Sequence, residues 1–352
     1  MSQIVVASFR LGGTDGVAIE AAKWIAALRL MGHDVTRVAG EGVVDVLVPG
    51  LAMHAASPPS LGELHRAFER SDLVIVENIV SLPLNAPARD VLYQALDGRE
   101  AFFHHHDLPW QREHLAHEEG PRDQATWRHA TINDLSRREL LDRGITASTM
   151  MNSFNCDPPR GDRDTTRRSL NIDGQCLLLM PTRAIARKNV EGALELAGAL
   201  DAVLWLLGPS EDGYGPHLDG LLARSAVEVR RGLASGQTVH DAYAACDLVV
   251  MPSTWEGFGN PVLESVTHRR PLAVYPYPVL EEIKSFGFEF FDLDDVAAII
   301  EFLRQPDETL LDRNLSIART HFNVNTLPAR LTQLLELSES GVRESVETAR
   351  DT

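Results

Sequence analysis

The chain has 352 residues, of which 44% are hydrophobic and 24% are charged. These proportions exclude collagen-like, low-complexity and largely disordered proteins, and the length suits two domains. The 33 lysines and arginines are outnumbered by 50 aspartates and glutamates, so the net charge is −17. Because such a charge repels nucleic acid and anionic membranes, we expect small-molecule partners, no nucleic acid and no stable membrane insertion.

The cysteines and the lengths of the apolar runs indicate the cellular compartment of the protein. The three cysteines, Cys156, Cys176 and Cys246, form neither a C-x-x-C pair nor a cluster with histidine at metal-binding spacing. This pattern is typical of a reducing compartment and predicts no structural zinc. The N-terminus carries no basic leader, and runs such as 202–207 are far shorter than the roughly 20 apolar residues that cross a bilayer. We therefore expect a cytoplasmic protein, as a monomer or a homo-oligomer.

Short apolar runs alternate with longer segments of helical periodicity in the first half of the chain. Strands are expected at 4–8, 34–39, 72–77 and 99–105, and a helix is expected at 16–31. The helix has an apolar stripe that includes Trp24 and Leu28, and Gly32 follows it as a stop signal. Alternation of this kind predicts a parallel sheet covered by helices.

The composition changes at 152–170, where adjacent prolines, a glycine, acids and arginines replace the apolar runs. We place a domain boundary there, because polar segments with proline are typical of linkers. Beyond it the alternation restarts, with strands expected at 176–180, 202–207, 227–230, 247–251, 271–275 and 288–291. The predicted fold class is α/β, with two doubly wound Rossmann-like lobes facing a cleft at the carboxyl ends of their strands.

The first candidate ligand loop follows the first expected strand, where the sequence LGGTDG contains Gly12, Gly13 and Gly16. Glycines at a strand-to-helix turn let the backbone approach a ligand, and the start of the helix favours an anion. The spacing differs from the G-x-G-x-x-G of dinucleotide-binding proteins. A tight turn without a ligand explains this loop equally well.

Three histidines, His104, His105 and His106, end an expected strand and are followed by Asp107 and Trp110. Side chains alternate between the faces of a strand, so the three cannot all bind one metal, and we expect no metal site. A histidine at the carboxyl end of a strand can instead hydrogen-bond a hydroxyl or accept a proton. A buried histidine without a function is the alternative, and Trp110 has packing as its alternative. The pattern alone leaves open which histidine faces the ligand.

Two cations, Arg183 and Lys188, lie between the strand expected at 176–180 and the next helix. A pair of cations at the mouth of a strand suits a diphosphate, because a departing diphosphate develops charge that must be neutralised. A solvated basic turn is the alternative, and it is kept for Arg187 in particular.

The most specific pattern is PSTWEGFGNPVLES, directly after an expected strand. Gly257 and Gly259 predict a loop that approaches a ligand closely, and Pro261 suits the first turn of a helix. Glu256 precedes that helix and Glu264 lies in its first turn, so the two carboxylates can reach different hydroxyls of one extended polar ligand.

Taken together, these motifs resemble those of the family-4 retaining glycosyltransferases of the GT-B fold, to which glycogen and sucrose-type synthases are related. The match covers most of the chain, in the order Gly12-Gly13, His106-Asp107, Arg183-x4-Lys188 and the E-x7-E pattern from Glu256 to Glu264. The resemblance implies a retaining hexosyltransferase that moves a hexose from a nucleotide diphosphate sugar to a hydroxyl of a small soluble or glycoside acceptor. It implies UDP- or GDP-hexose as the donor, with no metal and no further cofactor.

The same resemblance assigns roles to individual residues. The implied catalytic residues are His106, Arg183, Lys188 and Glu256. The implied donor-binding residues are Gly12, Gly13, Arg183, Lys188, Glu256, Gly257, Phe258, Gly259, Asn260 and Glu264. Within that set the two cations would hold the diphosphate, Glu264 the ribose and Glu256 the sugar hydroxyls. The implied acceptor contacts are Thr14, Asp15, Asp107 and Trp110, and the H-D-L pattern favours His106 as the histidine near the reacting end of the sugar.

The resemblance also gives the expected domains their roles. An acceptor-side lobe is expected at 1–155, a linker at 156–170 and a nucleotide-sugar-binding lobe at 171–326. A C-terminal helix at 327–352 would cross back to the N-terminal lobe. Backbone groups near 208–210 and 231–233 are expected to recognise the base of the donor.

Four alternatives are kept. Asp292-Leu293-Asp294 matches the Asp-x-Asp motif of metal-dependent transferases, although capping of the following helix explains these residues better. An epimerase of similar shape would release a changed sugar without an acceptor, and a non-catalytic sugar-nucleotide-binding protein would bind the donor without turnover. A lipid acceptor is the fourth, and we read the arginines of the linker as a solvated charge run rather than as a lipid site.

Overall fold

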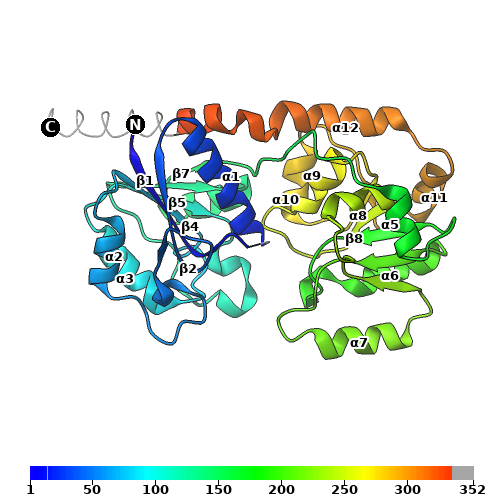
Figure 1. The fold of residues 1–352 in the computed structure, drawn as a ribbon, viewed down its shortest axis with the longest axis horizontal. Coiled ribbons are helices and arrows are strands. Elements are labelled where there is room, and N and C mark those ends of the chain that lie inside the picture. The colour runs from blue at the N-terminus through cyan, green and yellow to red at the C-terminus, as the bar shows by residue number, and fades with distance from the viewer. Residues whose placement is uncertain (14, 335–352) are drawn as a thin grey trace. The chain divides into compact units, whose positions relative to one another are not determined.

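The computed structural model of the chain describes residues 1–13 and 15–334, which form two compact units. The N-terminal unit comprises Met1–Ser153 and the segment that begins at Val324, and the C-terminal unit comprises Phe154–Asn323. Each unit is built on one parallel sheet with helices on its two faces (Figure 1). The predicted fold class, two doubly wound parallel α/β lobes, is confirmed.

The N-terminal unit has a seven-stranded parallel sheet of order β3-β2-β1-β4-β5-β6-β7. Its strands are β1 (Gln3–Leu11), β2 (Asp34–Gly42), β3 (Val46–Leu47), β4 (Leu73–Glu77), β5 (Ala101–His105), β6 (Trp127–Thr131) and β7 (Ala147–Thr149). Its labelled helices are α1 (Gly16–Leu30), α2 (Leu61–Phe68), α3 (Ala86–Leu96) and α4 (Asp134–Leu141). Short 3₁₀ segments lie at Pro49–Leu51, Pro109–Gln111, Glu113–Leu115 and Val324–Thr326.

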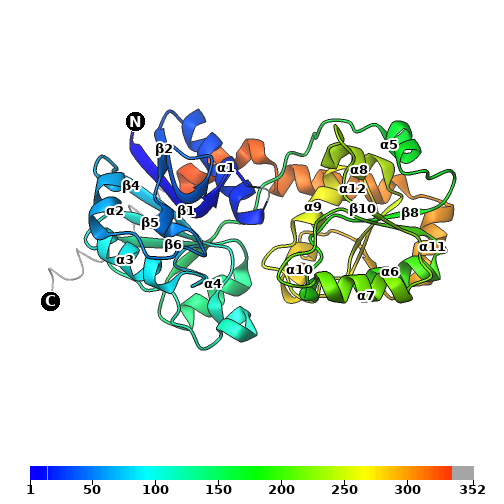
Figure 2. The same cartoon turned by 60° about the horizontal axis from the view of Figure 1, so that its bottom comes forward.

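The C-terminal unit has a six-stranded parallel sheet of order β10-β9-β8-β11-β12-β13. Its strands are β8 (Leu177–Met180), β9 (Val203–Leu206), β10 (Val229–Arg231), β11 (Leu248–Met251), β12 (Leu272–Val274) and β13 (Phe291–Asp292). Its helices are α5 (Arg163–Ser169), α6 (Val190–Ala199), α7 (Gly215–Arg224), α8 (Val239–Ala245), α9 (Asn260–Thr267), α10 (Pro278–Lys284), α11 (Val296–Arg304) and α12 (Glu308–His321), with a 3₁₀ turn at Ala186–Lys188. Helices α6 and α7 cover one face of this sheet, and α8 and α9 lie on the other (Figure 2).

The core of the N-terminal unit has two layers, because successive residues of each strand point to opposite faces of the sheet. One layer combines β1 with α2 and α3, and the other combines β1 with α1. Helix α1 begins where Oδ1 of Asp15 accepts a hydrogen bond of 3.1 Å from the backbone N–H of Ala18. Its apolar stripe then buries Trp24 and Leu28 against the sheet, as the periodicity predicts.

The described part of the C-terminal segment adds a helix to this unit. Residues 327–334 are helical, and Leu327, Leu331 and Leu334 pack into the same core layer as α1. The remainder of the helix expected at 327–352 lies outside the described residues.

One expected strand is shorter in the structure, and three observed strands were not expected. The apolar run 288–291 forms a strand only at its end, in β13, because Phe288 is buried and packs against Phe322 with ring centroids 5.8 Å apart. Strands β3, β6 and β7 were not expected. The first and last are only 2 and 3 residues long, and β6 carries Arg128 and His129, so none of them shows an apolar run.

The segment expected to be a linker, 156–170, is part of the C-terminal unit and contains helix α5. Arg163 donates hydrogen bonds to the carbonyls of residues 244–246 at the end of α8, and Arg163 and Arg167 both form ion pairs with Asp247. These arginines were expected to be a solvated charge run, and that expectation was wrong. A short polar helix of this kind has no apolar stripe, so its docking through arginine is invisible in the composition.

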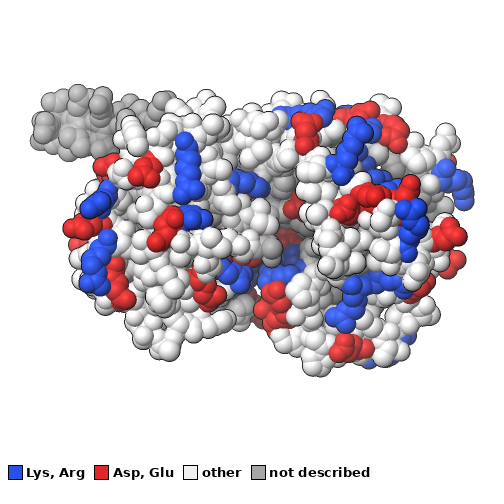
Figure 3. All heavy atoms as spheres, viewed as in Figure 1, with Lys and Arg blue, Asp and Glu red and all other residues white. Residues whose placement is uncertain are grey.

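Acidic and basic side chains are interspersed over both units on the face drawn in Figure 3, where neither sign dominates a large region. No helix in the described part of the chain is both long enough and apolar enough to span a bilayer.

Candidate functional site

The strand order of the C-terminal unit reverses between β8 and β11. The loops after two such strands run in opposite directions, and open α/β sheets bind ligands between these loops. The predicted cations lie on the segment after β8, with Lys188 in the 3₁₀ turn Ala186–Lys188. Glu256 lies on the loop after β11. The two most informative sequence motifs of this unit are therefore brought together at one edge of its sheet.

Lys188 and Glu256 form a buried ion pair. Nζ of Lys188 hydrogen-bonds Oε1 of Glu256, and Nη1 of Arg187 lies 2.9 Å from Oε2 of the same carboxylate. Burial lowers the pKa of Lys188 to about 8, against the opposing attraction of Glu256. For Glu256, burial alone would raise the pKa, but Lys188 and Arg187 together outweigh it and lower the pKa of that carboxyl. Arg187 was read as a solvated residue, and the structure corrects this.

Arg183 is held separately from this cluster. Its Nη1 lies 2.5 Å from Oε2 of Glu211, and both side chains are about two-fifths exposed, at 39% and 41%. Exposed ion pairs contribute little to stability, so this pair can open at low cost. Arg183 can therefore exchange Glu211 for an anionic ligand, whereas Lys188 cannot leave Glu256 without uncovering a buried carboxylate.

The loop before α9 is fixed by contacts around Gly259. This residue has φ +88°, a left-handed conformation, and a Cβ here would come within 2.3 Å of the Tyr277 hydroxyl oxygen. That hydroxyl donates a hydrogen bond of 2.9 Å to the carbonyl of Phe258. The side chain of Phe258 is buried and stacks on Phe154, with ring centroids 5.9 Å apart. Phe258 can therefore make its predicted donor contact only through its backbone. Gly257 and Asn260 flank the same loop, and Asn260 begins α9.

Glu264 lies on α9 and is held by a tyrosine of α8. The Tyr243 hydroxyl donates a hydrogen bond of 2.8 Å to Oε2 of Glu264. Tyr243 is fully buried, and burial followed by the nearby Glu264 charge raises its pKa well above the usual value. His268 stacks on the Tyr243 ring at 4.4 Å and hydrogen-bonds the Glu264 carbonyl at 2.7 Å. The carboxylate predicted to hold the ribose is thus oriented by Tyr243, and His268 packs on that tyrosine.

In the N-terminal unit the strand order reverses between β1 and β4. The predicted glycine loop follows β1, and Gly12 has φ +76°, with a Cβ there only 3.0 Å from Cβ of Val43. Gly13 is adjacent, whereas Thr14 lies outside the described residues. Asp15 caps α1 and also accepts hydrogen bonds from Arg10, the shorter at 2.9 Å. Capping accounts for Asp15, so the acceptor role predicted for it gains no support here.

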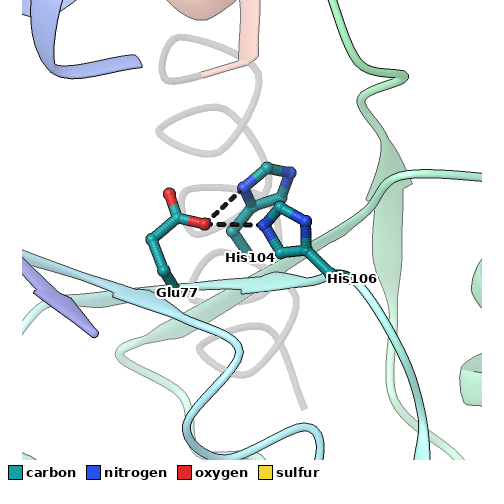
Figure 4. A group of neighbouring side chains, drawn as sticks. All are labelled: Glu77, His104 and His106. Atoms are coloured by element: carbon teal, nitrogen blue, oxygen red, sulfur yellow. Dashed lines mark hydrogen bonds and ion pairs between the residues drawn. The ribbon is translucent and has the colours of Figure 1, made fainter. Parts of the chain in front are cut away.

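The histidines divide between the two faces of β5, as strand alternation requires. His104 and His106 point to one side, where Oε2 of Glu77 lies 2.9 Å from Nδ1 of His104 and 2.8 Å from Nε2 of His106 (Figure 4). Glu77 ends β4 and pairs with His104 in the sheet register. Burial alone would raise the pKa of Glu77, but His104 and His106 outweigh it and bring the pKa to about 2. The three ligand atoms lie within 4.8 Å of one another, a spacing that a metal ion also tolerates.

His105 belongs to a different network on the opposite face. Its Nδ1 lies 2.6 Å from Oγ of Ser81, and its Nε2 lies 2.9 Å from Nδ1 of His129. His129 in turn is 3.1 Å from Oδ1 of Asp123. Burial, followed by the neighbouring histidines, lowers the pKa of His105 well below the usual value. His105 is a buried structural histidine, and the candidates for ligand contact reduce to His104 and His106.

The two remaining predicted acceptor residues have partners of their own. Nη2 of Arg112 lies 2.6 Å from Oδ1 of Asp107. The Trp110 indole N–H donates a hydrogen bond of 2.8 Å to Glu139, and the guanidinium of Arg143 lies 3.6 Å from the centroid of its ring. Packing therefore explains Trp110, in agreement with the alternative interpretation of this residue.

The Asp-x-Asp match differs from its expected structural role. Helix α11 is capped by Asp295, whose Oδ1 accepts a hydrogen bond of 3.0 Å from the backbone N–H of Ala298. Asp292 belongs to strand β13, and Asp294 precedes the cap. N-capping therefore falls on the residue after the motif.

Sequence reasoning missed four residues that hold the predicted ones in place, namely Glu77, Arg187, Glu211 and Tyr243. Glu77 offered a signal, because it is a carboxylate at the end of an otherwise apolar strand and therefore at the ligand-binding edge of the sheet. Tyr243 and Glu211 offered none, since their roles depend on which helices and loops pack together.

Comparison with known proteins bears on both units. Residues 162–304 match the family described as "Glycosyl transferases group 1", and this range lies within the C-terminal unit. Two mannosylglucosylglycerate synthases are similar over most of the chain. The protein from Petrotoga mobilis is 26% identical over 377 residues, covering 84% of this chain and 87% of the relative. The protein from Thermotoga maritima is 26% identical over 387 residues, covering 88% and 89%.

Solved structures match the fold over most of the chain. HepE from Anabaena, in complex with UDP-glucose, has a TM-score of 0.73 at 16% identity, covering 95% of this chain and 99% of that one. Sucrose-phosphate synthase from Thermosynechococcus elongatus also has a TM-score of 0.73, at 15% identity, covering 96% and 100%. The chain thus has the GT-B fold, and the combined matches support a glycosyltransferase.

Proposed function

We propose that the protein is a retaining, metal-independent hexosyltransferase. It transfers a hexose from a nucleoside diphosphate sugar to a hydroxyl of a small soluble acceptor. The C-terminal unit binds the donor nucleotide, and His106 of the N-terminal unit hydrogen-bonds a sugar hydroxyl.

The observation that carries the proposal is the cluster of Arg187, Lys188 and Glu256 at the switch point of the C-terminal sheet. Two cations share one carboxylate, so the cluster keeps one positive charge in excess. Arg183 can add a second by leaving Glu211. Positive charge of this kind neutralises a departing diphosphate without a metal ion, because the charge on the leaving group grows as the sugar–phosphate bond breaks. The cluster also lies inside the range that matches group 1 glycosyltransferases.

The way the two glutamates are held argues against a covalent intermediate, while retention itself is what the family resemblance implies. Both carboxylate oxygens of Glu256 are bound by cations, and Glu264 accepts a hydrogen bond from Tyr243. Such engaged carboxylates are poor covalent nucleophiles. Attack of the acceptor on the same face as the departing diphosphate, the course that the family resemblance implies, needs no enzyme nucleophile. Orientation and leaving-group stabilisation then supply the catalysis.

The acceptor class rests on the relatives. Both are named as synthases of mannosylglucosylglycerate, a name that describes a small glycoside carrying glycerate. A small polar acceptor also agrees with a chain of net charge −17, which disfavours anionic membranes and nucleic acid. We therefore assign a small soluble glycoside or hydroxy acid as the acceptor.

The test begins with donor binding. Thermal unfolding is measured in EDTA with UDP, GDP, ADP, TDP and their hexose conjugates, since a ligand at 100 times its dissociation constant adds about 2.7 kcal/mol of stability. One nucleotide is expected to stabilise the protein without a divalent metal. The matching sugar nucleotide is then incubated with small glycoside acceptors, and NMR of the product gives the anomeric configuration.

Variants connect the binding to the proposed residues. Lys188→Met and Arg183→Ala should each lower turnover by about 10² to 10³, as removal of one charge-stabilising donor does elsewhere. Arg304→Ala is the matched control, because Arg304 is 73% exposed and pairs only with Glu301 at 3.7 Å among the described residues. Turnover within a few-fold of wild type in both site variants would contradict the assignment. Binding that requires manganese, release of an altered sugar without acceptor, or binding without any turnover would instead favour the metal-dependent transferase, the epimerase or the non-catalytic protein.

A further inference from the structure

Glu77 hydrogen-bonds two histidines with a single oxygen. Oε2 faces Nδ1 of His104 and Nε2 of His106, and the carboxylate is completely buried (Figure 4). An ionised carboxylate can only accept hydrogen bonds. Both facing nitrogens must therefore carry a proton, which fixes the proton positions of the two rings without reference to any ligand.

His104 is the immobile member of this group. Its ring stacks on Trp24 at 4.2 Å with an interplanar angle of 26°. Its second nitrogen, Nε2, is buried and has no hydrogen-bond partner within the described residues. A proton on that nitrogen would leave a buried donor unsatisfied, which is costly. His104 is therefore the neutral Nδ1–H tautomer, and it serves to orient Glu77.

His106 is the outward member. Its Nε2 is committed to Glu77, and in Figure 4 its Nδ1 points away from that carboxylate. Among the described residues no hydrogen bond to this Nδ1 is formed, and His106 retains 4% of its surface exposed at the carboxyl end of the sheet. With the proton held on Nε2, Nδ1 carries a lone pair and can accept a hydrogen bond.

We propose that Glu77 is a positioning residue that locks His106 as the Nε2–H tautomer, so that Nδ1 accepts a hydrogen bond from a sugar hydroxyl. The sugar contact rests on the function proposed above, whereas the tautomer does not. A carboxylate that holds one ring nitrogen of a histidine sets the role of the other nitrogen in the same way in hydrolytic triads.

A bound cation is the rival explanation, because two histidines and a glutamate are common metal ligands. The O–N separations of 2.8 and 2.9 Å are those of hydrogen bonds, which account for the arrangement with protons alone. The completely buried carboxylate and His104 also leave little room for a substrate or water on such a metal. We therefore treat a cation as an outcome of the test rather than as the proposal.

The first experiment observes the tautomer in the full-length protein without substrate. Long-range ¹H–¹⁵N spectra of protein labelled with ¹⁵N at histidine distinguish the two tautomers, and His106→Asn identifies the His106 signals by their loss. The Nε2–H form is expected for His106, and the Nδ1–H form for His104. An Nδ1–H form of His106 would overturn the proposal, and so would a stoichiometric divalent metal found by elemental analysis of the purified protein. Neither outcome depends on activity.

The second experiment uses Glu77→Gln, which keeps the shape of the side chain. A neutral carboxamide is a weaker acceptor than a carboxylate and carries N–H donors of its own, so it holds the proton on Nε2 less strongly and we expect His106 to show mixed tautomers. If the protein is the proposed transferase, kcat/KM for the sugar nucleotide should fall roughly ten- to hundredfold. Affinity for the free nucleoside diphosphate should stay the same, because that ligand lacks the sugar hydroxyl that His106 is proposed to contact. An equal loss for both ligands would indicate a general structural defect and overturn the positioning role.

Asp123→Asn is the matched control for that variant. It alters a carboxylate that also meets a histidine, but on the opposite face of the sheet through His129. The His129 signals should change while those of His106 and the turnover do not. Unchanged tautomer and turnover in Glu77→Gln would also overturn the proposal.

Discussion

Lys188 and Glu256 are 68 residues apart in the chain and form one buried ion pair at the carboxyl-end edge of the C-terminal sheet. Only 6% of the surface of each residue remains exposed. Because Arg187 binds the other oxygen of the carboxylate, the position of the Lys188 ammonium is fixed before any ligand arrives. Preorganised charge of this kind loses little energy to reorganisation when a diphosphate binds.

The affinity for a nucleoside diphosphate should fall as the pH rises through about 8. Burial brings the pKa of Lys188 to about 8, so above this pH the free protein increasingly lacks the ammonium that is proposed to bind the diphosphate. Binding must then take up a proton, and the dissociation constant should rise by up to about tenfold per pH unit. Calorimetric titrations between pH 7 and pH 9.5 measure this. Lys188→Arg, which stays charged, should show a flat profile. An identical bend in that variant would assign the titration to another group.

Tyr243→Phe should weaken recognition of the ribose. The substitution removes the hydrogen bond of 2.8 Å to Glu264 while keeping the buried ring. A hydrogen bond to a charged group is worth about 1.5 to 3 kcal/mol, so we expect the affinity for the ribonucleotide to fall roughly tenfold or more. The 2′-deoxy or the 3′-deoxy nucleotide should lose less, depending on which hydroxyl Glu264 holds. Tyr93→Phe is the control, since it removes one hydrogen bond from a buried tyrosine of the other unit. An equal loss of affinity for all three nucleotides would show that Tyr243 does not act on ribose recognition.

Gly259→Ala should damage the loop before α9 far more than a similar change elsewhere. A Cβ at Gly259 would lie 2.3 Å from the Tyr277 hydroxyl oxygen and 2.7 Å from Cε of Met251. Gly213 has a similar positive φ of +74°, but a Cβ there meets nothing within 4 Å. Gly213→Ala therefore carries only the backbone cost of about 1 kcal/mol, whereas Gly259→Ala adds a steric clash. Urea unfolding and nucleotide binding test the pair, and equal losses of stability would show that the Tyr277 contact is unimportant.

Acid should destabilise the protein through His268. Burial lowers its pKa from 6.5 to about 4, so the unfolded chain binds a proton at a higher pH than the folded chain does. The stability that this residue contributes is present above pH 6.5 and is lost as the pH falls toward 4. At pH 5 the loss is about 2 kcal/mol. Urea unfolding at pH 7.5 and pH 5 should therefore differ less in His268→Gln than in wild type. A difference of the same size in both proteins would exclude His268 as the source.

The sequence predicted the strands that carry long apolar runs and the order of the motifs around them. These runs are buried on both faces of a parallel sheet, so their signal is strong. Strands β3 and β7 contribute 2 and 3 residues, which is too short for any periodicity. Helix α5 was missed because its docking depends on Arg163 and Arg167 meeting Asp247, a contact across about 80 residues of chain.

The sequence predicted the candidate ligand contacts of the site but not the residues that hold them in place. Arg183, Lys188 and Glu256 follow strands at the edge where ligands bind, which is a local property of the chain. The partners Glu77 and Tyr243 act on residues 27 and 21 positions away through the packing of neighbouring elements. Arg187 shows the same limit, since nothing local separates a solvated arginine from one bound to Glu256.

The packing of Leu327, Leu331 and Leu334 into the N-terminal core means that this unit is completed by the end of the described chain. All seven strands of the sheet are made long before those leucines leave the ribosome. During synthesis, the core layer that contains Trp24 therefore remains incompletely covered until the whole C-terminal unit has been made. A chain cut at the junction between Ser153 and Phe154 would for the same reason hold together, because the second fragment carries the three leucines that close the core of the first.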